Sequence, residues 1–493
     1  MKATEIGETA LVGWREKAAA GVASPLSRRT RLDEEQVRAL VGALFFTLAV
    51  YYVVGTLRRV ISAARSSRRS SLAEGEGAPL TRPICRWEIG TASGVRGCSA
   101  PRTILEVPRS ASPLPDSADV VILGGGVIGT SAAFHLAEAG VDVALVERAQ
   151  LGSGSTCRAA GGVRTQFSDA LNVEIAKRSL DAFRNFGRRP GWEIDLKQVG
   201  YMFLLSREPD VEKFERSIAL QNEYGLASRM LTAGEARELC PLVQGDDILA
   251  GAFSPGDGHA TPEGVVQGYA FAARAHGAEL RVNCEVLDIN ISGAEITEVV
   301  TDHGSIRTST VICAAGAWSR SCGAMVGLDL PVTPLRRQIL FTEAMDGLPA
   351  QIPMTIDFES SFYFHREGPG LLMGMSDPHE EPGFSVETTD DWIPGLLEVV
   401  RRRAPRIADA GIRGGWAGLY EMTPDHNAII GEAAGVSRFL YATGFSGHGF
   451  LQGPAVGEIL RDLVLGRPPL VDIEPLSLER FDTSALRPEY NLV

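Results

Sequence analysis

Two glycine-rich stretches combine a permissive backbone with side chains that can do chemistry. The first reads GGGVIG, and Gly124, Gly126 and Gly129 give it the GxGxxG spacing that lets backbone approach a phosphate. The second, Ala442–Glu458, reads ATGFSGHGFLQGPAVGE and sets five glycines around one histidine, His448. Glycine density of this kind indicates backbone pressed against a flat or charged group. Each stretch is therefore a candidate phosphate cradle, catalytic loop or turn before a helix.

The flanks of the first stretch predict a dinucleotide site. Val120–Leu123 is a short apolar run suited to a buried parallel strand, Ile128–Ala139 is typical of a helix, and Val141–Val146 predicts a second strand. Glu147 follows at the position where a carboxylate accepts a hydrogen bond from a ribose hydroxyl. Because an acid there disfavours a 2′-phosphate, we expect FAD or NAD and not NADP.

The residues that follow favour FAD. An NAD dehydrogenase continues with plain βα units, whereas Ala149–Asp169 is dense in small residues that let backbone lie against a flavin ring and its pyrophosphate. The second stretch leads into most of a helix over Gly457–Leu465, but no βαβ unit with a ribose-binding acid follows it. A second nucleotide, and with it an NAD(P)H-using reductase, is not expected.

With these motifs the chain resembles the D-amino-acid oxidase-type superfamily of FAD-dependent oxidoreductases. Within it, the chain is most similar to the sarcosine and dimethylglycine dehydrogenase-like branch and to that branch's relative that assists assembly of mitochondrial complex I. The resemblance covers about Ala118–Phe481 and includes Thr310–Ser319, Pro334–Met345, Phe362–Asp377 and Gly415–Glu432.

The resemblance implies an α/β fold with two discontinuous domains. A Rossmann-like FAD-binding domain is expected over 118–200, 255–325 and 415–482, and an α+β substrate domain with a mixed sheet over 201–254 and 326–414, before a tail at 483–493. The residues expected to bind FAD are Gly124, Gly126, Val127, Ile128, Gly129, Glu147, Arg148, Ser155, Thr156, Gly161, Gly162, Ala315, Gly316, Trp318, Gly444, Gly447, His448, Gly449, Phe450 and Leu451.

Departures from the family pattern imply non-covalent FAD. Enzymes of the dimethylglycine type attach FAD through a histidine where this chain has Arg158, and the monomeric sarcosine oxidases use a cysteine where it has Gly418. The oxidases also carry a lysine that promotes reaction of reduced flavin with oxygen, and Leu372 stands at that position. The resemblance therefore favours a dehydrogenase, with a quinone or an electron-transfer protein as acceptor.

The same resemblance implies a reaction and its residues. In this branch a hydride leaves the carbon next to an amine nitrogen, so a small-molecule amine or (N-alkyl) amino acid is the expected substrate, a bulkier or less polar amine than sarcosine included. Arg164 matches the arginine that clamps the substrate carboxylate, a role that suits a guanidinium fork, while Leu451 replaces a second cationic group. His448 is expected at the pyrimidine edge of the flavin, and Tyr420 and His365 are further catalytic candidates. The alternative is an FAD-binding assembly factor with little or no turnover.

Charge and cysteine content exclude other classes. The 493 residues carry a net charge of −13, and residues 1–117 alone carry +6, so the remainder is strongly acidic. Nucleic-acid binding needs a basic footprint, and is not expected. The seven cysteines form no CxxC pair and no cluster with histidine at metal spacing, which predicts free thiols and no metal site.

The N-terminal region predicts a single membrane anchor. Ala39–Leu57 is 19 residues without a charge, long enough to span a bilayer. Several arginines follow it, so the positive-inside rule places the body on the cytoplasmic or matrix side. We expect an anchor region over 1–60, a disordered linker over 61–117, and a mitochondrial inner membrane with the body in the matrix, another organelle membrane being the alternative.

Overall fold

The computed structural model describes residues 114–482 and 486–491. The predicted anchor at 39–57 and most of the predicted linker lie outside these residues. Within them, no helix has the length and apolarity needed to cross a membrane.

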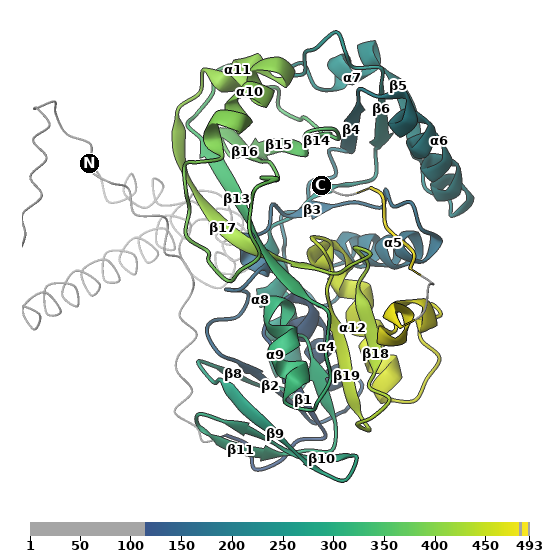
Figure 1. Cartoon of the computed structure of the whole chain (residues 1–493), viewed down its shortest axis with the longest axis vertical. Helices are drawn as coiled ribbons and strands as arrows, with labels where there is room; N and C mark the ends of the chain where they lie inside the picture. Colours follow the sequence, from purple (N-terminus) through teal and green to yellow (C-terminus); the bar gives the residue numbers. More distant parts are fainter. Residues whose placement is uncertain (1–113, 483–485, 492–493) are drawn as a thin grey trace, which may run out of the picture. The chain divides into compact units, whose positions relative to one another are not determined.

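The first layer is a six-stranded sheet in the order β18-β19-β12-β1-β2-β8. The neighbouring strands run parallel from β19 to β8, and β18 is antiparallel to β19. Helices α4, α8 and α12 pack together beside this sheet, in the lower half of Figure 1. The bounds are β1 (Val120–Leu123), α4 (Val127–Glu138), β2 (Val143–Glu147), α8 (Pro262–Ala275), β8 (Glu279–Val282), β12 (Val311–Cys313), β18 (Ile429–Glu432), β19 (Phe439–Thr443) and α12 (Gly449–Val464).

Helix α12 spans Gly449–Val464 and so extends N-terminally beyond Gly457–Leu465, the segment that the sequence assigns to most of the helix. Glycine and Pro454 disfavour a helix by propensity, but burial against α4 outweighs that cost. A Cβ on Gly453 would lie 2.6 Å from Val127 Cγ2, and one on Gly457 would lie 2.1 Å from Ser131 Oγ. These two glycines therefore serve close helix packing, and only the turn before them belongs to the cavity described below.

The second layer is an eight-stranded mixed sheet in the order β17-β13-β16-β15-β14-β4-β6-β5. Its strands are β4 (Tyr201–Leu205), β5 (Arg229–Thr232), β6 (Ala250–Ser254), β13 (Thr333–Thr342), β14 (Met354–Asp357), β15 (Phe362–Glu367), β16 (Gly370–Gly374) and β17 (Ile412–Met422). The predicted domain boundary near residue 414 falls inside β17, which pairs with β13 over almost its whole length.

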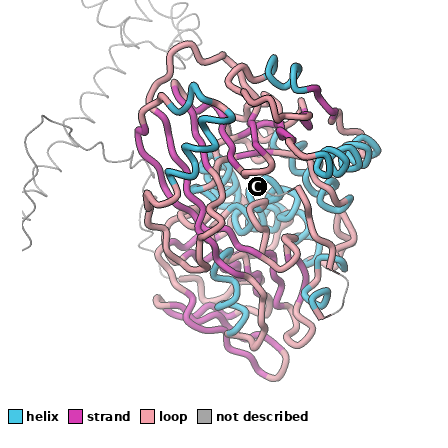
Figure 2. The backbone as a smooth tube through the Cα atoms, turned by 45° about the horizontal axis from the view of Figure 1, so that its top comes forward, coloured by secondary structure: helices cyan, strands magenta, loops and turns pink. Residues whose placement is uncertain are grey.

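Alternation along these strands gives the large sheet two apolar faces. One face packs against α7 (Ala233–Leu239), α10 (Ile393–Arg403) and α11 (Pro405–Ala408), and short helices lie along the strands in Figures 1 and 2. The other face holds Tyr201, Ile339, Met354 and Tyr363 and packs in part against α6 (Glu208–Glu223). The two-sheet α/β architecture expected from the sequence is confirmed.

Smaller elements flank the two main sheets. They are α5 (Ala170–Arg184), α9 (Ser319–Ala324), the pair β3 (Gly162–Val163) and β7 (Gly258–His259), and a three-stranded sheet of β9 (Val286–Ser292), β10 (Glu295–Thr301) and β11 (Gly304–Arg307). The segment 486–491 runs past the start of α5, as the yellow trace in Figure 1 shows.

Candidate active site

A cavity of about 730 Å³ lies between the two sheets and is lined by residues of both. Its size falls in the range of small-molecule sites. Of the twenty residues that we expected to bind FAD, all but Gly129 and Gly444 line it. Arg164, Tyr420 and His448 also line it, whereas His365 does not.

The turn between β1 and α4 leaves room only for backbone. Gly124 has a φ of +107°, and a Cβ there would lie 2.4 Å from the carbonyl oxygen of Ala314. Gly129 does not line the cavity. It packs against the backbone of this turn, and a Cβ on it would lie 2.0 Å from the carbonyl oxygen of Gly124. Gly126 is the N-cap of α4, and the first turn of the helix lines the cavity, with the amide of Val127 donating to Oγ1 of Thr156 at 3.1 Å.

Glu147 is held at the end of β2 for a ribose. Its carboxylate accepts from the amides of Gly125 and Ala149, both at 2.8 Å, and it lines the cavity. Nearby, the Arg148 guanidinium lies 3.9 Å from the ring centre of Trp318, which forms an adjoining wall. This glycine turn, helix N-terminus and carboxylate fit the pyrophosphate and ribose of FAD.

The other end of the cavity holds a buried guanidinium. Arg164 is 2% exposed, and its Nη2 donates to the carbonyl of Asn491 at 2.6 Å and lies 2.9 Å from Nε2 of His448, while Nη1 donates to the carbonyl of Gln166. Its Cζ stands 4.3 Å from the ring centre of Phe167. All three hydrogen-bond partners are neutral.

The pairing of Arg164 differs from that of the other buried arginines in the described residues. Arg403 pairs with Asp357 at 2.6 Å, and Arg480 pairs with Asp425 at 2.8 Å. No carboxylate of the described residues forms an ion pair with Arg164. The charge of Arg164 acts on the pKa of the buried Asp257, but that carboxylate accepts from the amide and hydroxyl of Thr165 and makes no ion pair with Arg164. A buried charge without an ion-pair partner is costly, so this position fits an anionic ligand.

His448 faces Arg164 in a defined protonation state. Arginine has only donors, so Nε2 of His448 accepts, and the proton of the neutral ring is on Nδ1. Burial, followed by the charge of Arg164, lowers the pKa of His448 well below its usual value. His448 therefore orients the guanidinium through one nitrogen and keeps a donor on the other.

Tyrosines from three strands surround the same end. Tyr201, Tyr363 and Tyr420 line the cavity, and burial raises the pKa of each. A Cβ on Gly447 would lie 2.6 Å from the ring of Tyr420, so the glycine turn before α12 is pressed against this tyrosine. Sequence reasoning found Tyr420 but missed Tyr201, which sits at the start of an ordinary apolar strand.

Arg337 and Glu421 also line the cavity and were missed. The guanidinium of Arg337 lies 5.3 Å from the ring centre of Tyr420. Glu421 accepts from Oγ1 of Thr443 at 3.0 Å and the amide of Gly444 at 3.2 Å, and burial raises its pKa to about 7. Alternation along β13 could have identified Arg337. It pairs with Gly418 of β17, so the two residues lie on the same face of the sheet, the face toward the cavity.

His365 holds a loop and does not reach the cavity. Its two ring nitrogens each lie 3.0 Å from a backbone carbonyl, those of Arg366 and Ala160, and its ring packs 4.1 Å from that of His259. His365 and Tyr363 are two residues apart in β15 and so lie on one face of the strand, but the loop at Ala160 covers the His365 end of that face. The placement therefore gives the predicted catalytic role of His365 no support.

The family departures have distinct surroundings. A Cβ on Gly418 would lie 2.8 Å from Cβ of Arg158, whose Nη1 donates to the carbonyl of Ala417 at 2.7 Å. Leu372 is buried in the large sheet among Ile339 and Tyr363 and is not part of the cavity wall. Leu451 lines the cavity and packs against an apolar cluster of Phe167, Val173 and Ala176.

The segment 486–491 closes the wall behind Arg164. Glu489 is 1% exposed and accepts from the amide and hydroxyl of Ser168, at 3.0 and 2.7 Å, and from Nδ2 of Asn172 at 3.1 Å. Its other carboxylate contact, with the amide of Asn491, orients the carbonyl that receives Arg164. Nothing in the local sequence signals this contact, because its two sides are more than 300 residues apart.

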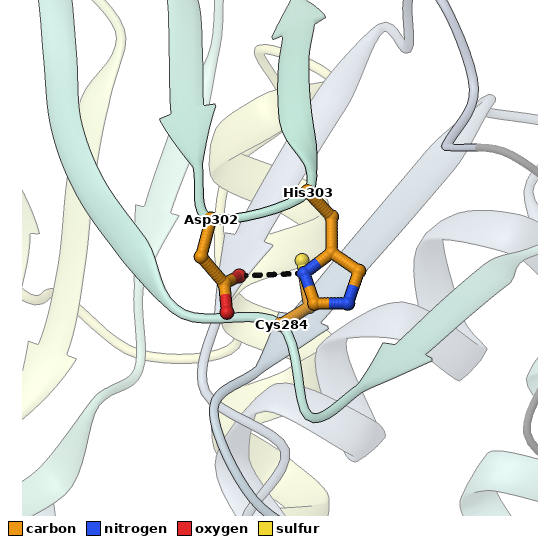
Figure 3. Close-up of side chains that lie close together, drawn as sticks. All are labelled: Cys284, Asp302 and His303. Atoms are coloured by element: carbon orange, nitrogen blue, oxygen red, sulfur yellow. Dashed lines mark ion pairs between the residues drawn. The ribbon is translucent and has the colours of Figure 1, made fainter.

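Three groups of metal-ligand type lie together away from the arginine end. In Figure 3 the side chains of Asp302 and His303 point toward one another, 2.9 Å apart, with the sulfur of Cys284 beside the ring. The sequence analysis missed this cluster because the β9–β10 hairpin brings together residues 18 positions apart. Asp302 already accepts from the amide of Glu285 at 2.8 Å, so we assign the cluster no part in the reaction.

Comparison with known proteins agrees with this geometry. Residues 119–463 match the family described as FAD dependent oxidoreductase (DAO). Mitochondrial dimethylglycine dehydrogenase of Mus musculus is 32% identical over 403 residues, which are 77% of this chain and 46% of that enzyme. The chain thus spans about half the length of such curated relatives.

Two further relatives match over most of their own length. FAD-dependent oxidoreductase domain-containing protein 1 of Bos taurus is 29% identical over 417 residues. The match covers 85% of that protein and 74% of this chain. The crystal structure of L-proline dehydrogenase from P. horikoshii superposes with a TM-score of 0.72 at 33% identity, covering 76% of this chain and 100% of that one. The chain belongs to the DAO family of FAD-dependent oxidoreductases, whose members similar to it include amino-acid and amine oxidoreductases.

Proposed function

We propose that the protein oxidises a C–N bond of an amine or N-alkyl amino acid, as a dehydrogenase that holds FAD without a covalent link. The observation that carries this proposal is Arg164, a buried guanidinium at the cavity wall with neutral partners only. A substrate carboxylate would supply the missing counter-charge.

The residues divide the work of positioning. Arg164 binds the substrate carboxylate, His448 fixes the guanidinium through Nε2 and offers Nδ1–H to the substrate, and the tyrosines with Phe167 exclude water. FAD, when bound, accepts the hydride from the carbon next to nitrogen. The N-terminus of α12, at Gly449, contributes a positive dipole end to the cavity wall.

Dehydrogenase chemistry and dissociable FAD rest on three residues. Leu372 stands where related oxidases carry a lysine, so we expect slow reaction with oxygen and transfer of electrons to a quinone or an electron-transfer protein. Arg158 and Gly418 stand where relatives attach the flavin. Acid precipitation should leave the yellow colour in solution; colour in the pellet would contradict the non-covalent assignment.

An FAD-binding assembly factor without turnover is the second candidate. The contact of Arg164 with Asn491 favours it, because one guanidinium nitrogen that a substrate would use is already hydrogen-bonded within the chain. The bovine relative of similar length is described only by its FAD-dependent oxidoreductase domain.

Anaerobic bleaching of the bound flavin distinguishes the two candidates. The full-length holoprotein would be mixed with N-methyl amino acids, imino acids and polyamines, and the flavin absorbance followed. We expect at least one amine carrying a carboxylate to reduce the flavin. If FAD stays bound and no compound reduces it, the assembly factor is favoured.

We further propose that the chain is anchored by Ala39–Leu57 in a mitochondrial inner membrane with the catalytic body in the matrix. The support is the uncharged run and the arginines that follow it. Deleting residues 1–60 should release the protein from carbonate-washed membranes. A deletion variant that stays in the membrane pellet would refute the anchor.

A further inference from the structure

Arg337 is a second guanidinium of the cavity wall without a counter-charge. It lies in β13, and its Nη1 donates only to the neighbouring carbonyl of Arg336, at 3.1 Å. Its Nε is buried and has no hydrogen-bond partner, and no carboxylate of the described residues forms an ion pair with it. Buried charged donors are normally satisfied, so this nitrogen indicates a ligand.

The preceding residue shows what an ordinary arginine of this strand does. Arg336 points to the opposite face, where its Nε donates to Glu380 at 2.9 Å and its Nη1 to the carbonyl of Glu387 at 2.7 Å. The two adjacent arginines therefore lie on opposite faces of β13. Arg336, outside the cavity, pairs with the carboxylate of Glu380, whereas Arg337, facing the cavity, pairs with no carboxylate of the described residues.

Arg337 and Arg164 approach the same tyrosine from different elements. Arg337 lies 5.3 Å from the ring centre of Tyr420, and Gly447 packs on that ring directly before His448, which contacts Arg164 at 2.9 Å. Burial raises the pKa of Tyr420, and the charges of both arginines oppose that shift. The two cations thus flank one tyrosine at the substrate end.

The phosphates of FAD do not account for Arg337. The residues that would hold them, Gly124 and the N-terminus of α4, lie on the six-stranded sheet. Arg337 projects from the other sheet and lies beside Tyr420. The charge beside Tyr420 is therefore left for the substrate.

From this arrangement we propose that the substrate is a secondary amine carrying two carboxylates, one bound by Arg164 and the other by Arg337. The inference rests on the proposed function and narrows its substrate class. Leu451, in α12, stands where the family pattern has a second cationic group. In this proposal Arg337, in β13, supplies that second cation instead.

The reaction balances for such a substrate. The C–H bond next to nitrogen breaks, its hydride passes to FAD, and the nitrogen loses its proton, so the amine is oxidised to an imine and the flavin gains two electrons and two protons. Water then adds to the C=N bond, which breaks to give a 2-oxo acid and an amino acid. Both carboxylates are retained throughout.

Matched substrate pairs test the proposal. Iminodiacetate is compared with sarcosine, and N-(carboxymethyl)-4-aminobutanoate with N-butylglycine, each pair differing in one carboxylate. Half-saturating concentrations are measured from anaerobic flavin reduction, or from perturbation of the flavin spectrum where no reduction occurs. We expect at least one dicarboxylate to bind about 10-fold more tightly than its partner, since Arg337 is only partly buried.

Variants assign that preference to one residue. Arg337→Met should abolish the ratio, whereas the adjacent Arg336→Met should keep it. Equal binding within both pairs of the wild-type holoprotein, with reduction by a monocarboxylate, would overturn the dicarboxylate inference and leave the proposed function intact. Binding or reduction by none of the compounds would overturn both. The binding ratio between dicarboxylate and monocarboxylate is measured on the wild-type protein, so the inference can be overturned even if Arg337→Met does not fold. If Arg337→Met folds and keeps this ratio, the inference is overturned as well.

Discussion

The two ends of the cavity are built in different ways. The nucleotide end is mostly backbone from one continuous βαβ unit, with Gly124, the α4 N-terminus and Glu147 close together in sequence. The arginine end is made of side chains from distant segments, with Arg164, Arg337 and His448 meeting around Tyr420. The first end depends on the absence of side chains, and the second depends on guanidinium groups that form no ion pair within the described residues.

The largest expected effect breaks the nucleotide end alone. Gly124→Val would place a branched side chain where a Cβ already lies 2.4 Å from the Ala314 oxygen, at a φ of +107°. We expect loss of bound FAD, measured as the flavin-to-protein absorbance ratio of the purified protein. Gly140→Ala is the matched control, because Gly140 also has a positive φ but meets nothing within 4 Å, and it should retain FAD. Full flavin content in Gly124→Val would refute the cradle.

The next largest effect separates the two roles of His448. His448→Gln keeps an acceptor for Arg164 in its amide oxygen but moves the N–H donor away from the position of Nδ1, so we expect flavin reduction to slow by about 100-fold with FAD content unchanged. Because the pKa of His448 is well below its usual value, the rate of flavin reduction in the wild type should not change near pH 6.5 through protonation of this residue. An unchanged anaerobic reduction rate would remove His448 from the site.

A smaller effect is expected from the segment that holds Arg164 in place. Glu489→Ala removes the buried acceptor of the Ser168 amide and hydroxyl and leaves Nδ2 of Asn172 with Asn427 as its one remaining acceptor. We expect KM for a carboxylate substrate to change by about 10-fold while kcat and FAD content change little. Arg487→Met, which removes an exposed pair with Asp169, is the control. Equal KM values in the wild type, Glu489→Ala and Arg487→Met would show that the segment 486–491 does not affect substrate binding.

The smallest effect concerns Glu421, between the two ends. Burial raises its folded-state pKa from 4.5 to about 7, so between these values the folded protein binds more protons than the unfolded chain. Its stabilising contribution is complete below about pH 4.5 and is lost as pH rises through about 7. Glu421→Gln should therefore flatten the fall of the urea midpoint of the holoprotein from pH 5 to pH 7.5. An identical slope in both proteins would contradict the raised pKa.

Sequence patterns predicted the nucleotide end well because its determinants are local. A buried strand, a glycine turn and a helix follow each other within 20 residues, and their periodicity identifies them. β1 has the bounds that the apolar run predicts, and α4 differs by one residue at each end. Helix α12 extends N-terminally beyond the predicted Gly457–Leu465 segment and includes Gly453 and Pro454, because tertiary packing overrides their poor helix propensity.

The arginine end was predicted only in part because its contacts are long-range. Arg164, Tyr420 and His448 were predicted through the family resemblance, and the structure brings all three to one cavity wall. Arg337 looks like its neighbour in the sequence, and only the cross-strand pairing with Gly418 reveals which one faces inward. The contact with Asn491 spans 327 positions, so no local pattern signals it.

The most direct test of the account is anaerobic reduction of the bound flavin by the best carboxylate-bearing amine, in the wild-type holoprotein and in Arg164→Met side by side. Removing one partner of a buried charge pair costs several kcal/mol. The account therefore predicts that Arg164→Met keeps its FAD but needs about 100-fold more substrate for half-maximal reduction. Reduction of both proteins at the same substrate concentration, or of neither by any amine, would contradict it.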